Sequence, residues 1–130
     1  MDLSQIDTRF LEVDAASAAT FIRGLQYLET YFMRVWNGYE SKQDVLMLMD
    51  VMNQIAKYYY SWLASIVRYT DLYIMTTDFL IYFCRFHVAQ FQFMRTNIKT
   101  ERFRVIQSDF KKALDLYKSE VQKWYSGQFL

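Results

Sequence analysis

The absence of proline from all 130 residues, with only three glycines, most constrains how this chain can fold. Proline removes a backbone N–H and clashes with the preceding turn, so a chain without it has few obligatory helix breaks. Large apolar residues also recur at steps of three and four along most of the chain, which is the spacing of one helical face. We therefore expect long helices and an all-α fold.

The apolar periodicity divides the chain into helices within one domain that spans residues 1–130. Residues 1–13 lack the periodicity and are predicted to form an irregular arm, and a short apolar tail follows the last helix. The expected architecture is an all-α bundle of about four helices. The predicted helices cover residues 15–37, 42–66, 77–95 and 101–125.

Capping residues support several of these boundaries. Asp14 is a candidate N-cap for the first helix, and SKQD (residues 41–44) resembles a capping box for the second. Gly38 and Gly127 are expected to end the first and last helices as C′ residues. The segment RYTDLYIM (68–75) stays open between the tail of the second helix, a short strand and an extended crossing.

The four predicted helices differ in how their apolar residues are distributed. Residues 77–95 are apolar nearly all round, which favours a central position in the bundle. The second helix has an inner stripe and also a second apolar set, which implies a central position or a partner. That second set comprises Leu46, Met47, Met49, Tyr58 and Tyr60. The last helix has the cleanest single stripe: Phe103, Ile106, Phe110, Ala113, Leu114, Tyr117, Val121 and Trp124.

The chain contains more aromatic and methionine side chains than a small bundle needs inside. It has 11 Tyr, 11 Phe, 3 Trp and 7 Met. These residue types are enriched in protein interfaces, and Tyr suits sites where one end of the side chain stays wet. We expect some of them to form a subunit interface, with burial in the core as the alternative for each. The interface candidates are Tyr58, Tyr60, Met47, Trp124, Tyr125, Phe129 and Leu130.

Residues able to carry out catalysis are scarce. Cys84 and His87 lie one helical turn apart and could in geometry share a metal, but a structural site needs more ligands. A buried thiol beside a partly exposed imidazole is the favoured interpretation. No third group orients them for nucleophilic catalysis. Asp78 and Arg85, two turns apart, are interpreted as a structural pair. We predict no enzyme activity, no metal and no cofactor.

The charge balance also limits the partners. Fifteen basic and 14 acidic side chains give a net charge of +1, which provides no electrostatic footprint for nucleic acid or an anionic membrane. The longest unbroken apolar run, FLIYFC (79–84), is too short to span a bilayer. A single cysteine favours a reducing cytoplasm.

The second half of the chain, about residues 43–130, resembles head–tail connector proteins of Mu-like tailed phages. The resemblance rests on IAKYYYSWLAS (55–65), on the Arg68-Tyr69 pair, on TDFLIYFCRF (77–86) and on SDFKKALDLYKSEVQKWYSGQFL (108–130). In the last segment Phe110 takes the place of a family tyrosine, whereas Ala113, Gly127 and Leu130 match the pattern. The proline that follows the Arg-Tyr pair in the family is absent here, and residues 15–37 have no counterpart.

The resemblance implies a structural role in a phage neck. Such a protein is made in the bacterial host cytoplasm and assembles in the virion as a ring homo-oligomer, dodecameric by family resemblance. Its partners are the portal protein and the tail or stopper proteins, and nucleic acid at most passes through the ring lumen. Phe129 and Leu130 would then be anchors for a pocket on another subunit, or they fold back on the last helix.

A second hypothesis does not depend on the resemblance. A small helical protein-binding module, of the immunity, anti-defence or chaperone type, also lacks catalytic residues. It too would present aromatic surface to a partner protein.

Overall fold

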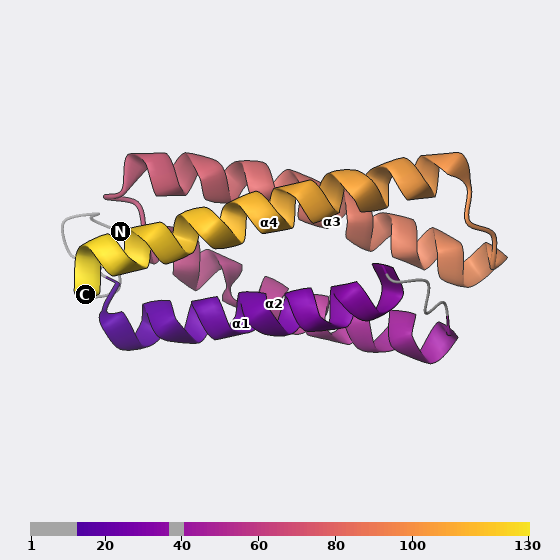
Figure 1. The fold of residues 1–130 in the computed structure, drawn as a ribbon, viewed down its shortest axis with the longest axis horizontal. Coiled ribbons are helices and arrows are strands. Elements are labelled where there is room, and N and C mark those ends of the chain that lie inside the picture. The colour runs from indigo at the N-terminus through magenta and orange to yellow at the C-terminus, as the bar shows by residue number, and fades with distance from the viewer. Residues whose placement is uncertain (1–12, 37–40) are drawn as a thin grey trace, which may run out of the picture.

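The computed structural model describes residues 13–36 and 41–130, except for the side chain of Tyr60. This part of the chain forms four helices and no strand, which confirms the expected all-α bundle (Figure 1). Of the arm predicted over residues 1–13, only Val13 is described, and it is not helical. The predicted C′ residue Gly38 lies outside the described residues. The helices are α1 (Ala15–Trp36), α2 (Lys42–Ser65), α3 (Thr70–Thr96) and α4 (Glu101–Phe129).

Successive helices run in alternating directions, so the described chain forms an up-down-up-down bundle (Figure 1). Contacts join α1 to α2, α2 to α3, α3 to α4 and α4 to α1. The four helices therefore occupy the corners of a square in chain order, which short connections favour. The C-terminal end of α4 lies beside the N-terminal end of α1 (Figure 1).

Polar side chains cap three helix starts, and two of these caps, Asp14 and Ser41, are predicted from the sequence. Asp14 Oδ1 accepts a hydrogen bond from the Ser17 backbone N–H at 2.7 Å. Ser41 Oγ accepts from the Asp44 N–H at 3.1 Å. Thr100 Oγ1 accepts from the Phe103 N–H at 3.0 Å. Each bond satisfies one backbone donor that has no intrahelical partner.

The predicted start of the third helix at residue 77 is wrong, because α3 begins at Thr70. A short turn at the end of α2, closed by the Tyr69 N–H on the Ile66 carbonyl at 2.9 Å, is enough to reverse the chain. Thr76 has the residue type of an N-cap but lies inside the helix. Its hydroxyl donates to the Leu72 carbonyl one turn earlier at 2.7 Å, a bond that threonine makes within helices.

The predicted end of the fourth helix at residue 125 is also wrong. The helix includes Gly127 and continues to Phe129, and the Leu130 N–H donates to the Ser126 carbonyl at 3.2 Å. Gly127 is therefore not a C′ residue, and the apolar tail is mostly helical. Glycine adopts helical angles as readily as left-handed ones, so its presence alone does not end a helix. The second helix ends at Ser65, one residue before the predicted end, and the predicted end of the first helix at residue 37 lies outside the described residues.

The prediction that the third helix is central is wrong as well. One face of α3 lies in the core through Phe79, Phe83 and Phe86, but the opposite face is exposed and still apolar. Ile81 and Val88 on that outer face are 51% and 57% exposed. A helix that is apolar all round can therefore occupy a corner if its outer face is left without a partner.

Aromatic rings make up much of the core. Phe110 of α4 is fully buried, and its ring lies within 4.7 to 6.4 Å of four phenylalanine rings from α1 and α3. These four are Phe32, Phe79, Phe83 and Phe86. The predicted inner stripe of the last helix is thus confirmed at its centre.

A buried polar chain joins three of the helices. Trp62 Nε1 of α2 donates to the Tyr117 hydroxyl of α4 at 3.0 Å. That hydroxyl lies 2.7 Å from Thr76 Oγ1 of α3. Because the Thr76 proton is directed at the Leu72 carbonyl, the Tyr117 hydroxyl must donate to Thr76. Every donor in this chain has an acceptor, which is the condition for a buried polar network to stabilise a core.

Candidate protein-binding groove

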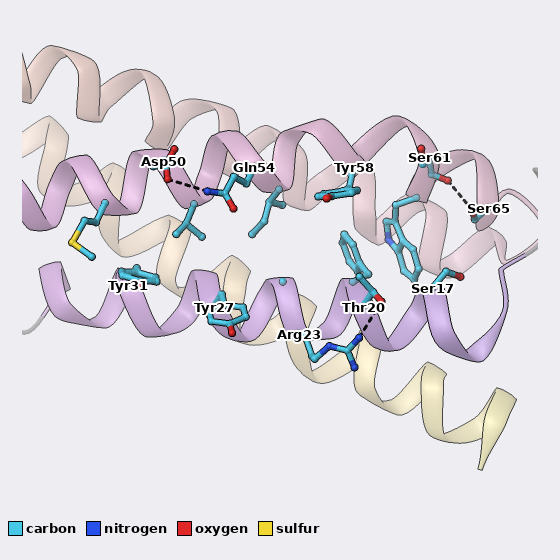
Figure 2. A pocket seen from close by; sticks show the side chains of 16 residues that line it. Ser17, Thr20, Arg23, Tyr27, Tyr31, Asp50, Gln54, Tyr58, Ser61 and Ser65 are labelled. Atoms are coloured by element: carbon cyan, nitrogen blue, oxygen red, sulfur yellow. Dashed lines mark hydrogen bonds between the residues drawn. The ribbon is translucent and has the colours of Figure 1, made fainter.

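A long groove runs along the outer surface of the bundle between α1 and α2 (Figure 2). Its volume is about 730 Å³. The two helices contribute residues at alternating steps of three and four, the spacing of a coiled-coil seam. The α1 wall contains Ser17, Thr20, Gly24, Tyr27 and Tyr31, and the α2 wall contains Met47, Val51, Gln54, Tyr58, Ser61 and Ser65.

The floor of the groove is apolar and rigid. Phe21 of α1 stacks on Trp62 of α2 with ring centroids 4.1 Å apart and planes 11° apart. Both rings are buried, as is the neighbouring Ile55. Since Trp62 Nε1 is also bonded to Tyr117, the floor is fixed to the centre of the bundle.

Gly24 gives the groove its depth at the middle of the α1 wall. A Cβ at this position would meet only Ile55 Cγ1, at 3.9 Å, which is an ordinary van der Waals distance. An alanine would therefore fit. A longer side chain at the same place would extend into the groove rather than into the core.

The walls carry polar groups that are mostly neutral. Two charged side chains line the groove, Arg23 on α1 and Asp50 on α2. Arg23 donates to Thr20 Oγ1 at 3.1 Å, and Gln54 Nε2 donates to Asp50 Oδ2 at 2.9 Å (Figure 2). Each charge is thus held along its own helix, and the apolar space between the walls stays open.

Two tyrosines project from opposite walls and are largely exposed. Tyr27 of α1 is 64% exposed and Tyr58 of α2 is 63% exposed. A buried aromatic ring contributes much of the contact energy at a protein interface, and tyrosine loses little conformational entropy when it is ordered. These two side chains are therefore the best contact residues that the groove offers.

The predicted interface residues fall in two separate places. Met47 and Tyr58 line the groove, whereas the side chain of Tyr60 lies outside the described part of the structure. The other four, Trp124, Tyr125, Phe129 and Leu130, lie at the end of α4. Sequence periodicity alone does not separate these two sets.

The aromatic residues at the end of α4 pack on the bundle. Trp124 is partly buried, with ring centroids 5.8 Å from Trp62 and 5.1 Å from Tyr69. Phe129 contacts Trp124 and Tyr125 at 5.7 and 5.4 Å, so its ring folds back on its own helix. Leu130 alone projects, with 89% of its surface exposed.

Cys84 and His87 do not form a site. Cys84 is exposed, so the prediction of a buried thiol is wrong: the residue lies on the outer, not the inner, face of α3. His87 Nε2 lies 3.0 Å from Asn53 Oδ1, and burial lowers the pKa of the imidazole. The described residues contain no group of three or more His, Cys, Asp and Glu side chains able to hold a metal ion.

Asp78 and Arg85 share a face, as predicted, and line a second hollow between α3 and α4. Within the part of the chain that the structure describes, no ion pair joins them. Their interpretation as a structural pair within one chain is therefore not supported by a contact.

The α1 half of the groove was missed by sequence analysis. Residues 15–37 contain a strong apolar stripe that forms the core. The second stripe, which lines the groove, is less apolar and was therefore not recognised. The signal is nevertheless present, because Ser17, Thr20, Gly24, Tyr27 and Tyr31 repeat at steps of three and four on another face.

Comparisons with known proteins identify no relative. No family model, no curated protein and no solved structure matches the chain. In addition, none of the described helices combines the length and the apolar character that crossing a membrane requires.

Proposed function

We propose that this protein is a non-catalytic helical binding protein whose α1–α2 groove receives an amphipathic helix from another protein. The supporting observation is the shape of the groove. Its α1 wall extends over 14 residue steps, from Ser17 to Tyr31, or about 21 Å at 1.5 Å per residue. A compact ligand would use a fraction of that length, whereas a helix of about four turns would fill it.

The spacing of the groove walls favours the same occupant. Two antiparallel helices with seam residues at alternating steps of three and four present holes for the side chains of a third helix. Small residues at one end, Ser17 and Thr20 on α1 with Ser61 and Ser65 on α2, allow the backbone of that helix to approach closely. Binding of a helix in an apolar groove is a common mode of peptide recognition.

The groove chemistry restricts which helices fit. Its floor is apolar, and one cation and one anion stand on opposite walls. The matching helix has an apolar stripe with anchors at i, i+3, i+4 and i+7, flanked by neutral polar residues. A strongly charged helix would lose solvation without finding matching charges.

Selection from a displayed library of helical peptides tests this proposal. Peptides enriched on the full chain should share a heptad apolar stripe and a near-neutral flank. Enriched peptides without helical periodicity would contradict it.

A matched pair of variants locates the binding. Gly24→Ala leaves the groove open and should bind the selected peptides as tightly as the native chain. Gly24→Leu fills the groove, and we expect affinity to fall by at least about tenfold, as loss of a central apolar contact does. Leu116→Glu, on the exposed surface of α4, controls for general surface effects. Equal binding by both Gly24 variants would place the peptide elsewhere.

A second candidate function, a structural connector of a tailed-phage neck, is favoured by the end of α4. Leu130 is 89% exposed and follows an aromatic cluster that is anchored to the bundle through Trp124. A projecting apolar residue on a fixed base suits docking on a portal ring. The groove would then hold a segment of a neighbouring subunit, a heterologous contact of the kind that closes rings.

Size measurement with and without a portal ring tests the connector proposal. A connector should form a ring-sized species or bind the portal ring stoichiometrically. If the protein forms no ring and does not bind the portal ring, the connector proposal is rejected. Peptide binding that is sensitive to Gly24→Leu would still support the binding function.

A further inference from the structure

The outer face of α3 carries a second apolar seam that the bundle leaves uncovered. Its residues follow a heptad spacing of three and four over 17 residue steps, or about 26 Å. Four of the six are 50% to 57% exposed, and Cys84 is also exposed. The seam consists of Ile74, Thr77, Ile81, Cys84, Val88 and Phe91.

This seam is separate from the surface of α3 that forms the core. The core side contains Phe79, Phe86 and Phe93, which occupy the heptad position opposite the seam. A single helix therefore has two apolar faces with the same repeat. One covers the bundle interior, and the other points away from α1, at the corner farthest from it.

The seam residues are suited to burial. Ile74, Ile81 and Val88 are β-branched residues at equivalent heptad positions, and such stiff side chains lose little conformational freedom when they are buried. The one hydroxyl in the seam, on Thr77, already donates to the Ile74 carbonyl at 2.7 Å. Covering the seam would thus leave that hydroxyl paired, which removes the usual cost of burying one.

We propose that two copies of this chain associate through this seam, with their α3 helices antiparallel. A stripe along one helix is self-complementary about a twofold axis, so the contact is isologous and stops at two subunits. In the symmetric register, large side chains meet smaller ones across the axis. The layers pair Ile74 with Phe91, Thr77 with Val88, and Ile81 with Cys84 of the second copy.

Charge complementarity fixes this register and direction. Asp78 and Arg85 flank the seam on its α4 side, and neither has an ion-pair partner among the described residues. In the antiparallel register Asp78 of each copy faces Arg85 of the other, which gives two opposite-charge pairs. A parallel pair would instead set these charges against Tyr73 and Leu80, which carry none.

The dimer leaves both α1–α2 grooves open to solvent, because the seam lies on the opposite side of the bundle. This inference is therefore independent of the proposed function, and its test uses no peptide. The area that a single pair of helices buries is at the small end of the range for stable interfaces. The association should therefore be measured up to high protein concentration.

Sedimentation equilibrium of the full chain, from about 1 µM to about 1 mM, measures the association. We expect a reversible monomer–dimer equilibrium. Ile81→Glu should weaken it by at least about a hundredfold, because it places two carboxylates in the centre of the apolar seam. Leu46→Glu, at an equally exposed site on α2, should leave it unchanged. A native chain that stays monomeric over the whole range overturns the proposal.

Charge reversal tests the register. Asp78→Arg and Arg85→Asp each turn both pairs into like-charge pairs and should weaken the homodimer by roughly tenfold. An equimolar mixture of these two variants restores both attractive pairs and should form a heterodimer at least as stable as the native homodimer. Failure of the mixture to associate more tightly than either variant alone refutes the register.

The single cysteine of the chain reports whether the seam lies at the interface. With helix axes 8–10 Å apart, Cα atoms about 2.3 Å from each axis on the facing sides and a shift of about three residues along the helices, the two Cys84 Cα atoms would lie roughly 6–8 Å apart. A short bis-maleimide should therefore link two copies through Cys84. No cross-linked dimer at a concentration where sedimentation shows dimer would overturn the proposed arrangement.

Discussion

Two buried tyrosines should respond in opposite ways when their hydroxyl is removed. Tyr117 is 2% exposed and its hydroxyl is bonded to both Trp62 and Thr76. Tyr59 is 7% exposed, and its buried hydroxyl has no hydrogen-bond partner. Burial raises the pKa of both phenols. The change to phenylalanine is the same in each case, so the difference isolates the hydrogen bonds.

The expected magnitudes follow from the partners that each change leaves behind. Tyr117→Phe leaves the Trp62 N–H buried without an acceptor, which costs about 1–3 kcal/mol. With a central value of about 2 kcal/mol, the melting temperature should fall by roughly 8 °C in a domain of this size. Tyr59→Phe removes an unsatisfied group and should raise the free energy of unfolding by about 1 kcal/mol.

Urea denaturation followed by far-UV circular dichroism provides the assay. The slope of the unfolding free energy with urea concentration should be the same in all variants, so that a shifted midpoint reports a change in stability alone. Thr76→Val combined with Tyr117→Phe should cost less than the sum of the two single changes, because both ends of one bond become apolar. If the free energy of unfolding of Tyr117→Phe lies within about 0.5 kcal/mol of the native value, the buried hydrogen bonds of Tyr117 do not stabilise the core as described.

Four further outcomes are expected. Phe110→Asp places a charge in a fully buried site and should abolish cooperative unfolding; undiminished stability would mean that the core is misassigned. Thr100→Ala removes the α4 N-cap and should cost about 1 kcal/mol, measured by the same denaturation. NMR titration of His87, the single histidine, should give a midpoint below the ordinary pKa of 6.5. Protonation is less favourable in the folded state than in the unfolded state. The contribution of His87 to the free energy of unfolding is therefore fully present above pH 6.5 and is lost as the pH falls below that value. Truncation after Gly127 should leave the helical spectrum and the cooperative transition intact, since Leu130 is exposed and Phe129 packs only at the bundle end; loss of folding would make residues 128–130 part of the core.

The fold class and much of the core could be predicted from the sequence, because core positions repeat with the helical period. Phe110, Leu114 and Val121 are buried as the stripe of the last helix predicts. Helix ends were harder to predict, since they depend on local residue types that have more than one use. Thr76 can cap a helix or bond within one, and Gly127 can end a helix or continue it.

The position of a helix in the bundle could not be predicted from its own sequence. An apolar outer face on α3 looks the same whether a neighbouring helix or a second molecule covers it. For a related reason, only the α2 wall of the groove could be predicted from the sequence. Met47 and Tyr58 stand out as apolar residues off the main stripe of α2, but the opposing wall contains Ser17, Thr20 and Gly24, whose small size matters only once α1 and α2 lie side by side.

The two apolar surfaces have different consequences for assembly. The α3 seam binds the same surface of a second copy, so this contact produces a dimer and no larger assembly. The groove binds a different surface, so contacts through it can add further chains. A dimer joined through α3 would present two grooves, and two helices tethered in one partner would then bind with greater avidity than one. A ring, by contrast, needs the heterologous contact alone.

Amide NMR spectra of the full chain, recorded during titration with a library-selected helical peptide, test the central claim most directly. The account predicts shift changes that follow both groove walls, from Ser17 to Tyr31 on α1 and from Met47 to Ser65 on α2, and that disappear in Gly24→Leu but persist in Gly24→Ala. Changes confined to α3 and α4, or identical titrations for the two Gly24 variants, would contradict the assignment of the groove as the binding site.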